Sequence, residues 1–183
     1  MLSSPLEFDD EDELSYARGL PPSVCLTFDP DRWEGLEWAR RKGHWACNQR
    51  PPEIEGAWFV DLGDACSLLG MKGAQYLHSD RHMLSDFPDQ HGHCWNAVVD
   101  VDGDQMLLVR ETEDAYRHHR LEVGALIYFN AYQTHLVSRS DPQDRCVIVQ
   151  VGGIGPDEPE RALEAMGKAL EQACAGRVRR AAA

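Results

Sequence analysis

Three residues of the chain, His78, Asp80 and His135, have the types and spacing that could hold a metal ion. His78 and Asp80 are two positions apart, so in an extended segment their side chains leave on the same face. A histidine on a distant strand would complete a set of three metal ligands, and His135 is the best candidate for it. Two imidazoles and one carboxylate on one face of a metal leave the opposite positions open for other ligands. We call these three residues the metal triad.

Arg145 follows His135 by ten positions and opens the apolar run 146–151, which the sequence predicts as a buried strand. An arginine committed to a strand inside a barrel needs an anion to pair with, because an unpaired buried charge is costly. The alternative is a surface arginine that pairs with Asp141 or Asp144, and such a pair contributes little to stability.

The metal triad followed by a basic residue about ten positions after the distal histidine resembles the pattern of the Fe(II)- and 2-oxoglutarate-dependent dioxygenases. The resemblance covers roughly residues 74–151. It includes the glycine-led apolar run 123–130, which looks like the family's strand before the distal histidine. No particular member of the family matches the whole chain.

This resemblance implies both cofactor and activity. Fe(II) would be held by the metal triad, and 2-oxoglutarate would be the co-substrate, with its far carboxylate on Arg145. The implied reaction is hydroxylation by dioxygen of an amino acid, a peptidyl residue or a small metabolite. The iron would carry the difficult chemistry, and the protein would supply position and a dry cavity.

The sequence departs from the family at the position two residues after the arginine. Some members place a serine there, which helps to hold the 2-oxoglutarate carboxylate, whereas this chain has Val147. A tyrosine hydroxyl from a neighbouring strand could replace it, and Tyr128 and Tyr76 are the candidates. Arg139, four positions after His135, is a second candidate for binding the anion.

Two other kinds of barrel stay open. A cupin-type metal site would use His91, His93 and His135, but the glutamate expected a few residues after the His-x-His is absent, because residues 95–98 are Trp-Asn-Ala-Val. The other alternative is a metal-free binding barrel whose histidines are ordinary polar surface. We expect the neighbouring pair His118 and His119 to face solvent.

The composition excludes several classes of protein. The net charge of -13, from 18 Lys and Arg against 31 Asp and Glu, disfavours contact with a phosphate backbone, so we expect no nucleic-acid partner. The six cysteines form no C-x-x-C pair, which argues against a zinc ribbon or a secreted disulfide framework. No apolar run is long enough to span a bilayer, and no signal pattern is present. We therefore expect a cytoplasmic protein that does not contact a membrane, and its oligomeric state is not predicted.

The 183 residues suffice for one domain of ordinary size. Residues 7–13 contain six acidic residues in seven, and such a run repels itself, so we predict a flexible tail over 1–18 and a single domain over 19–183. An Asp102-Gly103 pair between two apolar runs favours a β-hairpin.

Regular short strands at this spacing predict a mainly β fold, a double-stranded β-helix or jelly-roll, cupin-like barrel, with flanking N- and C-terminal helices. We predict helices over 32–42, stopped by Gly43, over 64–69, and from 157–160 onwards, where an apolar stripe should pack on the outside of the sheet. The predicted strands are 24–28, 57–62, 73–78, 94–101, 105–110, 119–122, 125–130, 134–138 and 145–151.

Overall fold

The computed structural model describes residues 20–48, 57–72, 92–112 and 114–181, so the predicted tail lies outside the described residues. The elements follow one another along the chain as β1 (Val24–Thr27), the 3-10 helix η1 (Pro30–Arg32), α2 (Leu36–Asn48), β2 (Ala57–Gly63), β3 (Cys66–Lys72), β4 (His93–Val101), β5 (Gln105–Thr112), β6 (Ala115–Leu121), β7 (Ala125–Asn130), β8 (His135–Arg139), β9 (Arg145–Gly152) and α3 (Pro159–Ala181).

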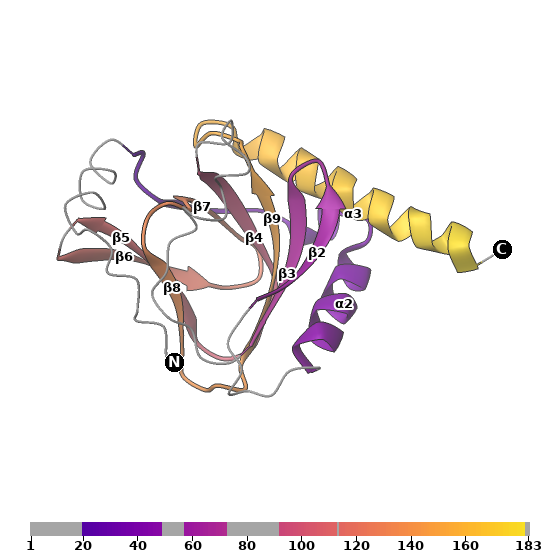
Figure 1. Cartoon of the computed structure of the whole chain (residues 1–183), viewed down its shortest axis with the longest axis horizontal. Helices are drawn as coiled ribbons and strands as arrows, with labels where there is room; N and C mark the ends of the chain where they lie inside the picture. Colours follow the sequence, from indigo (N-terminus) through magenta and orange to yellow (C-terminus); the bar gives the residue numbers. More distant parts are fainter. Residues whose placement is uncertain (1–19, 49–56, 73–91, 113, 182–183) are drawn as a thin grey trace, which may run out of the picture.

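The described strands form two antiparallel sheets that face each other (Figure 1). The larger sheet has the order β1-β7-β4-β9-β3-β2, and the smaller has the order β6-β5-β8. The chain passes from β4 to β5 in the opposite sheet, returns at β7, crosses again at β8 and returns at β9. This alternation is that of a double-stranded β-helix, so the predicted mainly β barrel with flanking helices is confirmed.

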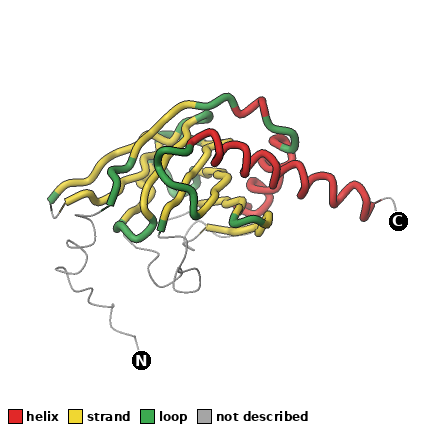
Figure 2. The backbone as a smooth tube through the Cα atoms, turned by 90° about the horizontal axis from the view of Figure 1, so that it is seen from above, coloured by secondary structure: helices red, strands yellow, loops and turns green. Residues whose placement is uncertain are grey.

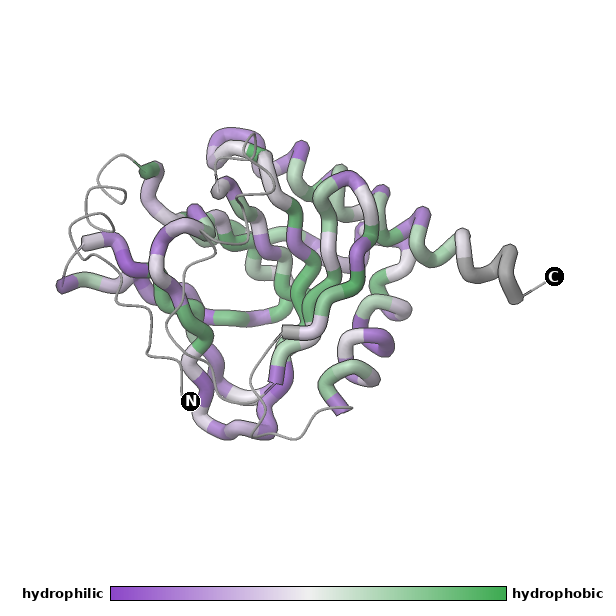
Figure 3. The backbone as a smooth tube through the Cα atoms, in the orientation of Figure 1, coloured by the Kyte–Doolittle hydropathy of each residue, from purple (hydrophilic) through white to green (hydrophobic). Residues whose placement is uncertain are grey.

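Helices α2 and α3 cover the face of the larger sheet that lies away from the smaller sheet (Figure 2). The molecule therefore has three layers and two separate apolar cores, and the apolar residues concentrate in the strands (Figure 3). The barrel interior, between the two sheets, includes Leu107, Val109, Ile127, Phe129, Val137, Cys146 and Ile148. The helix-facing core includes Trp95, Tyr128, Val147, Val149, Ala39, Met166 and Leu170.

Strand β9 shows how the larger sheet serves both cores. Cys146 and Ile148 point into the barrel interior, whereas Val147 and Val149 point to the helices. Because both faces are covered, the strand is apolar along almost its whole length. The sequence therefore predicted the strand but did not indicate toward which face each side chain points.

The predicted hairpin at Asp102-Gly103 is wrong. Its two strands form, as β4 and β5, but β4 pairs with β7 and β9, while β5 pairs with β6 and β8. Gly103 has a positive φ of 67° at this turn, and a Cβ there would lie 2.3 Å from an Asp144 carboxylate oxygen. The turn therefore carries the chain from one sheet to the other, a choice that local turn chemistry does not decide.

The predicted helix over 64–69 is also wrong, because this segment turns at Asp64 and Ala65 and returns as β3. Both turn residues have positive φ, 51° and 58°, as a tight hairpin turn requires. The pairing of β3 with β2 on one side and β9 on the other outweighs any local helical preference.

Helix α2 begins at Leu36 and continues through Gly43 to Asn48, so the predicted stop at Gly43 is wrong. A Cβ at Gly43 would lie 2.5 Å from a methyl carbon of Val147. The glycine therefore allows the helix to approach the sheet closely and does not end it. The C-terminal helix is confirmed, and it packs on the outside of the larger sheet. No helix in the described ranges is long and apolar enough to cross a membrane.

Candidate functional site

His135 is the first residue of β8 and is buried in the barrel interior. Its Nδ1 lies 2.8 Å from the carbonyl oxygen of Gln133, and its ring packs against Phe129, with ring centroids 4.8 Å apart. A carbonyl oxygen only accepts hydrogen bonds, so Nδ1 of the neutral ring carries the proton. Nε2 is then the basic nitrogen, which is the tautomer that a metal-ligating histidine needs.

Arg139 ends the same strand and points to the same side as His135. Alternate residues of β8 face one way, and Val137, between the two, belongs to the barrel interior. At about 3.3 Å per residue, the Cα atoms of His135 and Arg139 are about 13 Å apart. Burial lowers the pKa of the Arg139 guanidinium, and the thiols of Cys146 and Cys47 act in the opposite direction.

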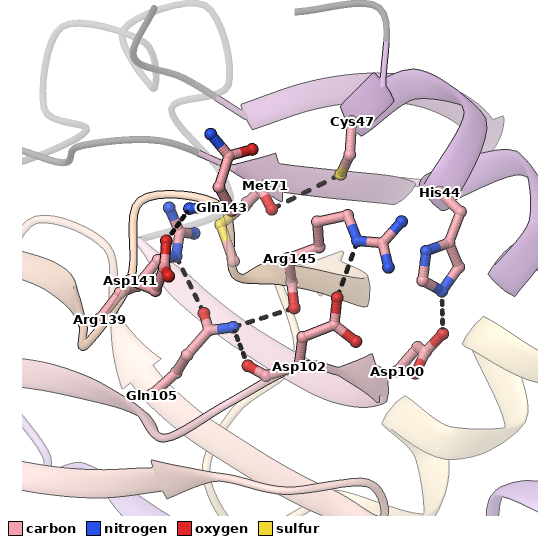
Figure 4. Close-up of polar contacts among 10 residues, drawn as sticks. All are labelled: His44, Cys47, Met71, Asp100, Asp102, Gln105, Arg139, Asp141, Gln143 and Arg145. Atoms are coloured by element: carbon pink, nitrogen blue, oxygen red, sulfur yellow. Dashed lines mark hydrogen bonds and ion pairs between the residues drawn. The ribbon is translucent and has the colours of Figure 1, made fainter. Parts of the chain in front are cut away.

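Gln105 faces Arg139 from the neighbouring strand β5 and is fully buried. Its Oε1 accepts a hydrogen bond from Arg139 Nε at 2.9 Å, and its Nε2 donates to the main-chain oxygens of Asp102 and Arg145 at 2.7 and 2.9 Å (Figure 4). A cation is therefore held by a neutral amide on the barrel-interior side of the smaller sheet.

Three polar side chains of the larger sheet also face the barrel interior. Asn96 and Gln150 are directly opposite each other on β4 and β9, and both donate to the Cys94 thiol, at 3.5 and 2.7 Å. These amides lie one step along the barrel from Phe129, which pairs with Cys94 and packs on His135. Polar groups therefore recur along the interior between the levels of His135 and Arg139.

The prediction that Arg145 points into the barrel interior, where it could bind an anion, is wrong. It has the same orientation on β9 as Val147, on the helix-facing side, and its Nε lies 2.8 Å from the Asp102 carboxylate. A bulge in β4 between Val98 and Asp100 turns both Asp100 and Asp102 to that side. The expected alternative partners Asp141 and Asp144 do not make this ion pair; Asp102 does.

Tyr128, predicted to assist the 2-oxoglutarate carboxylate, lies in the helix-facing core. Its hydroxyl is 2.7 Å from Nδ1 of His93, which puts His93 on that side of the sheet as well. Burial raises the pKa of Tyr128 to about 12. Both side chains therefore point away from the barrel interior, where His135 lies.

His119, expected to face solvent, is buried, and its Nε2 lies 2.8 Å from the Ser23 hydroxyl. Ser23 in turn donates to Glu111 at 3.0 Å, and Glu111 pairs with Arg117 at 2.7 Å. This network ties the segment before β1 to strands β5 and β6. His118 is exposed, as expected.

His78, Asp80, Tyr76 and His91 lie outside the described residues. Among the residues that are described, no three His, Cys, Asp or Glu side chains come together as a metal site. The metal triad therefore stays a prediction, and His135 is the member of it that lies within the described residues.

The sequence contained an unused signal for Arg139. His135, Val137 and Arg139 alternate, so a histidine placed inside the barrel puts the arginine four positions later on the same face. Gln105 alternates in the same way with Leu107 and Val109 and could have been assigned to the interior. We used the spacing from His135 to Arg145 instead, and that spacing says nothing about which face an apolar strand presents.

No protein-family model and no curated protein sequence matches the chain. Among solved structures, it is similar to a prolyl-4-hydroxylase from Pseudomonas putida, with 12% identity over 78% of this chain and 99% of that chain and a TM-score of 0.50. A 2OG-Fe(II) oxygenase family oxidoreductase from Burkholderia pseudomallei gives 17% identity over 80% and 91% of the two chains, with a TM-score of 0.46.

A Bacillus subtilis oxalate decarboxylase gives 17% identity over 58% of this chain, with a TM-score of 0.38, and this chain spans 28% of its length. At these identities the similarity concerns the fold. The alternation of strands between two sheets, together with the similarity in fold to the prolyl-4-hydroxylase, identifies the chain as a double-stranded β-helix with flanking helices.

Proposed function

We propose that this chain is an Fe(II)- and 2-oxoglutarate-dependent oxygenase that hydroxylates an amino acid, a peptidyl residue or a small metabolite. The metal triad would hold the iron. Arg139, rather than Arg145, would pair with the far carboxylate of 2-oxoglutarate.

One observation carries this proposal: a histidine and an arginine lie on the same face of β8, both turned into the barrel interior. A guanidinium turned into the barrel can pair with a carboxylate through two parallel hydrogen bonds, so this arginine is placed to bind an anionic co-substrate.

The known geometry of His135 fits a metal ligand. The hydrogen bond from Nδ1 to the Gln133 carbonyl fixes the ring orientation and makes Nε2 the basic nitrogen, which is the atom that would coordinate the metal. Fe(II) bound together with 2-oxoglutarate would supply the activation of dioxygen. Phe129, Val137 and Leu107 surround this part of the interior with apolar surface and so limit access of water.

The cupin alternative has less support from the described residues. His93 would have to point to the same side as His135, but its ring is bonded to Tyr128 on the helix-facing side. A change of ring orientation alone would not bring it through the sheet.

The proposal is tested by anaerobic Fe(II) binding and by release of succinate from 2-oxoglutarate. We expect stoichiometric iron in the wild type and in His93→Ala, and loss of iron in His78→Ala, Asp80→Ala and His135→Ala. Circular dichroism would check that each variant keeps the fold.

Three results would contradict the proposal. Stoichiometric iron in all three triad variants would remove the triad, and loss of iron in His93→Ala with retention in Asp80→Ala would favour the cupin-type set. A wild type that binds iron but never consumes 2-oxoglutarate with any substrate pool would remove the co-substrate assignment.

A further inference from the structure

The amide of Gln105 has a single orientation that satisfies its surroundings. Two main-chain oxygens, of Asp102 and Arg145, lie at 2.7 and 2.9 Å from one end of it, and both can only accept hydrogen bonds. The NH2 group must therefore occupy that end. The oxygen is left to face Arg139, whose Nε donates to it at 2.9 Å.

The two carbonyls that fix this amide are themselves held in place. Asp102 N donates to the Arg145 carbonyl at 2.8 Å, and the side chains of the same two residues form an ion pair at 2.8 Å. Figure 4 shows the result: Gln105 lies between Arg139, which it binds through its oxygen, and the Asp102–Arg145 pair. The turn that crosses between the two sheets is thereby joined to the start of β9.

Gln105 is also not a surface residue, where an amide could bind to water. It is 0% exposed and directly opposite Arg139 in the β5–β8 pairing, with Leu121 opposite it on β6. A methionine or leucine would fill this position without needing three hydrogen bonds. The amide matters because a carboxylate there would neutralise Arg139, whereas an amide oxygen orients the guanidinium and leaves its charge in place.

From these contacts we infer that Gln105 is a positioning residue for anion binding: it orients the Arg139 guanidinium toward a carboxylate of the ligand while preserving its charge. This inference rests on the proposed function, because it takes Arg139 to bind the far carboxylate of 2-oxoglutarate. The Arg145–Asp102 ion pair, outside the barrel, acts on the site only by holding the carbonyls that fix Gln105.

The test compares two 2-oxo acids on the anaerobic Fe(II) protein, each followed by its metal-to-ligand absorption band. 2-Oxoglutarate has the far carboxylate, and 2-oxobutyrate has the same keto acid without it. A purely structural change would weaken both ligands alike, so the ratio of their dissociation constants isolates the Arg139 contact. Gln105→Glu and Gln105→Met are the variants, and Asp100→Asn, which disturbs a neighbouring contact with His44, is the matched control.

We expect the wild type and Asp100→Asn to prefer 2-oxoglutarate strongly. In Gln105→Glu the preference should fall by about tenfold or more, because the new carboxylate pairs with Arg139 and competes with the ligand. Gln105→Met should show a smaller fall. If both variants lose the fold, Gln105→Asn takes their place, since the shorter amide withdraws its oxygen from Arg139 Nε, and the preference should again fall.

A preference unchanged in every folded variant of this set, in a protein where Arg139→Ala does abolish it, would overturn the inference and leave the proposed function standing. A wild type that shows no band with either acid would instead remove the proposed function itself. The two failures are therefore distinguishable.

Discussion

The helix-facing core and the barrel interior lie on opposite sides of the larger sheet and are built on different principles. The helix-facing side is closely packed by α2 and α3, and its charged pairs, such as Arg145 with Asp102, lie at half-buried positions near its rim. The barrel interior has polar groups deep inside, among them His135, Gln105 and Asn96. We therefore expect the residues that dominate stability on the helix-facing side of the larger sheet and the proposed ligand-binding residues in the barrel interior.

The largest effect on stability should come from the helix-facing side. Trp95 is fully buried there, packs on Tyr128 and donates from Nε1 to the Gly155 carbonyl at 3.0 Å. Trp95→Ala should lower the free energy of unfolding by about 3–5 kcal/mol, measured by urea denaturation. The exposed Trp45 is the control, and Trp45→Ala should cost about 1 kcal/mol or less. Equal losses would mean that this core does not dominate stability.

The contact of α2 with the sheet should respond to added volume. Gly43→Ala places a methyl group against Val147 and should destabilise by about 1–3 kcal/mol, despite the better helix propensity of alanine. Gly176 in α3 has nothing within 4 Å of the corresponding position, so Gly176→Ala should stabilise by about 0.5–1 kcal/mol. Thermal unfolding of the two variants gives the comparison, and a gain in both would contradict the close approach.

How far the sequence predicts this molecule depends on which residues carry the evidence. The strand 125–130 and the C-terminal helix follow from local periodicity and were predicted close to their observed bounds. The partner of β4 does not, because the Asp102-Gly103 turn is equally compatible with a hairpin and with a crossing between sheets. The orientation of Arg145 was wrongly predicted for a related reason: a strand that is apolar on both faces does not reveal where its first residue points.

The interior should tolerate loss of charge better than loss of volume. Arg139→Met removes a half-buried guanidinium and leaves the Gln105 oxygen without its donor, but it keeps an unbranched side chain, so the free energy of unfolding should fall by about 1–3 kcal/mol, less than for Trp95→Ala. Binding of 2-oxoglutarate should nevertheless be lost. Chemical denaturation and ligand titration on the same preparation give both values. A large loss of stability would indicate that Arg139 is a structural residue.

The smallest effect concerns the network of His119, Ser23 and Glu111. Burial, followed by the Arg117 charge, lowers the pKa of His119, so the unfolded chain binds this proton more readily. Stability should therefore fall as the pH drops below about 6.5, by at most about 1.4 kcal/mol per pH unit. Glu111 also has a lowered pKa, because hydrogen bonds from Arg117 and Ser23 outweigh burial, but its contribution is lost only below about pH 4.5.

Unfolding of the wild type and of His119→Gln between about pH 7.5 and 5.5 isolates the histidine from the carboxylate. The variant should show a shallower loss of stability over this range, and His118→Gln should behave like the wild type, because His118 is exposed. Identical pH profiles for all three proteins would show that His119 does not titrate against folding.

The most direct test of the division between the two faces is titration of 2-oxoglutarate into the anaerobic Fe(II) forms of Arg139→Ala and Arg145→Ala. A charge-assisted pair contributes about 1.5–3 kcal/mol, so Arg139→Ala should raise the dissociation constant by about 10- to 150-fold. Arg145→Ala should leave it within about threefold of the wild type, since its side chain pairs with Asp102 outside the barrel. Loss of binding in Arg145→Ala with normal binding in Arg139→Ala would contradict the account.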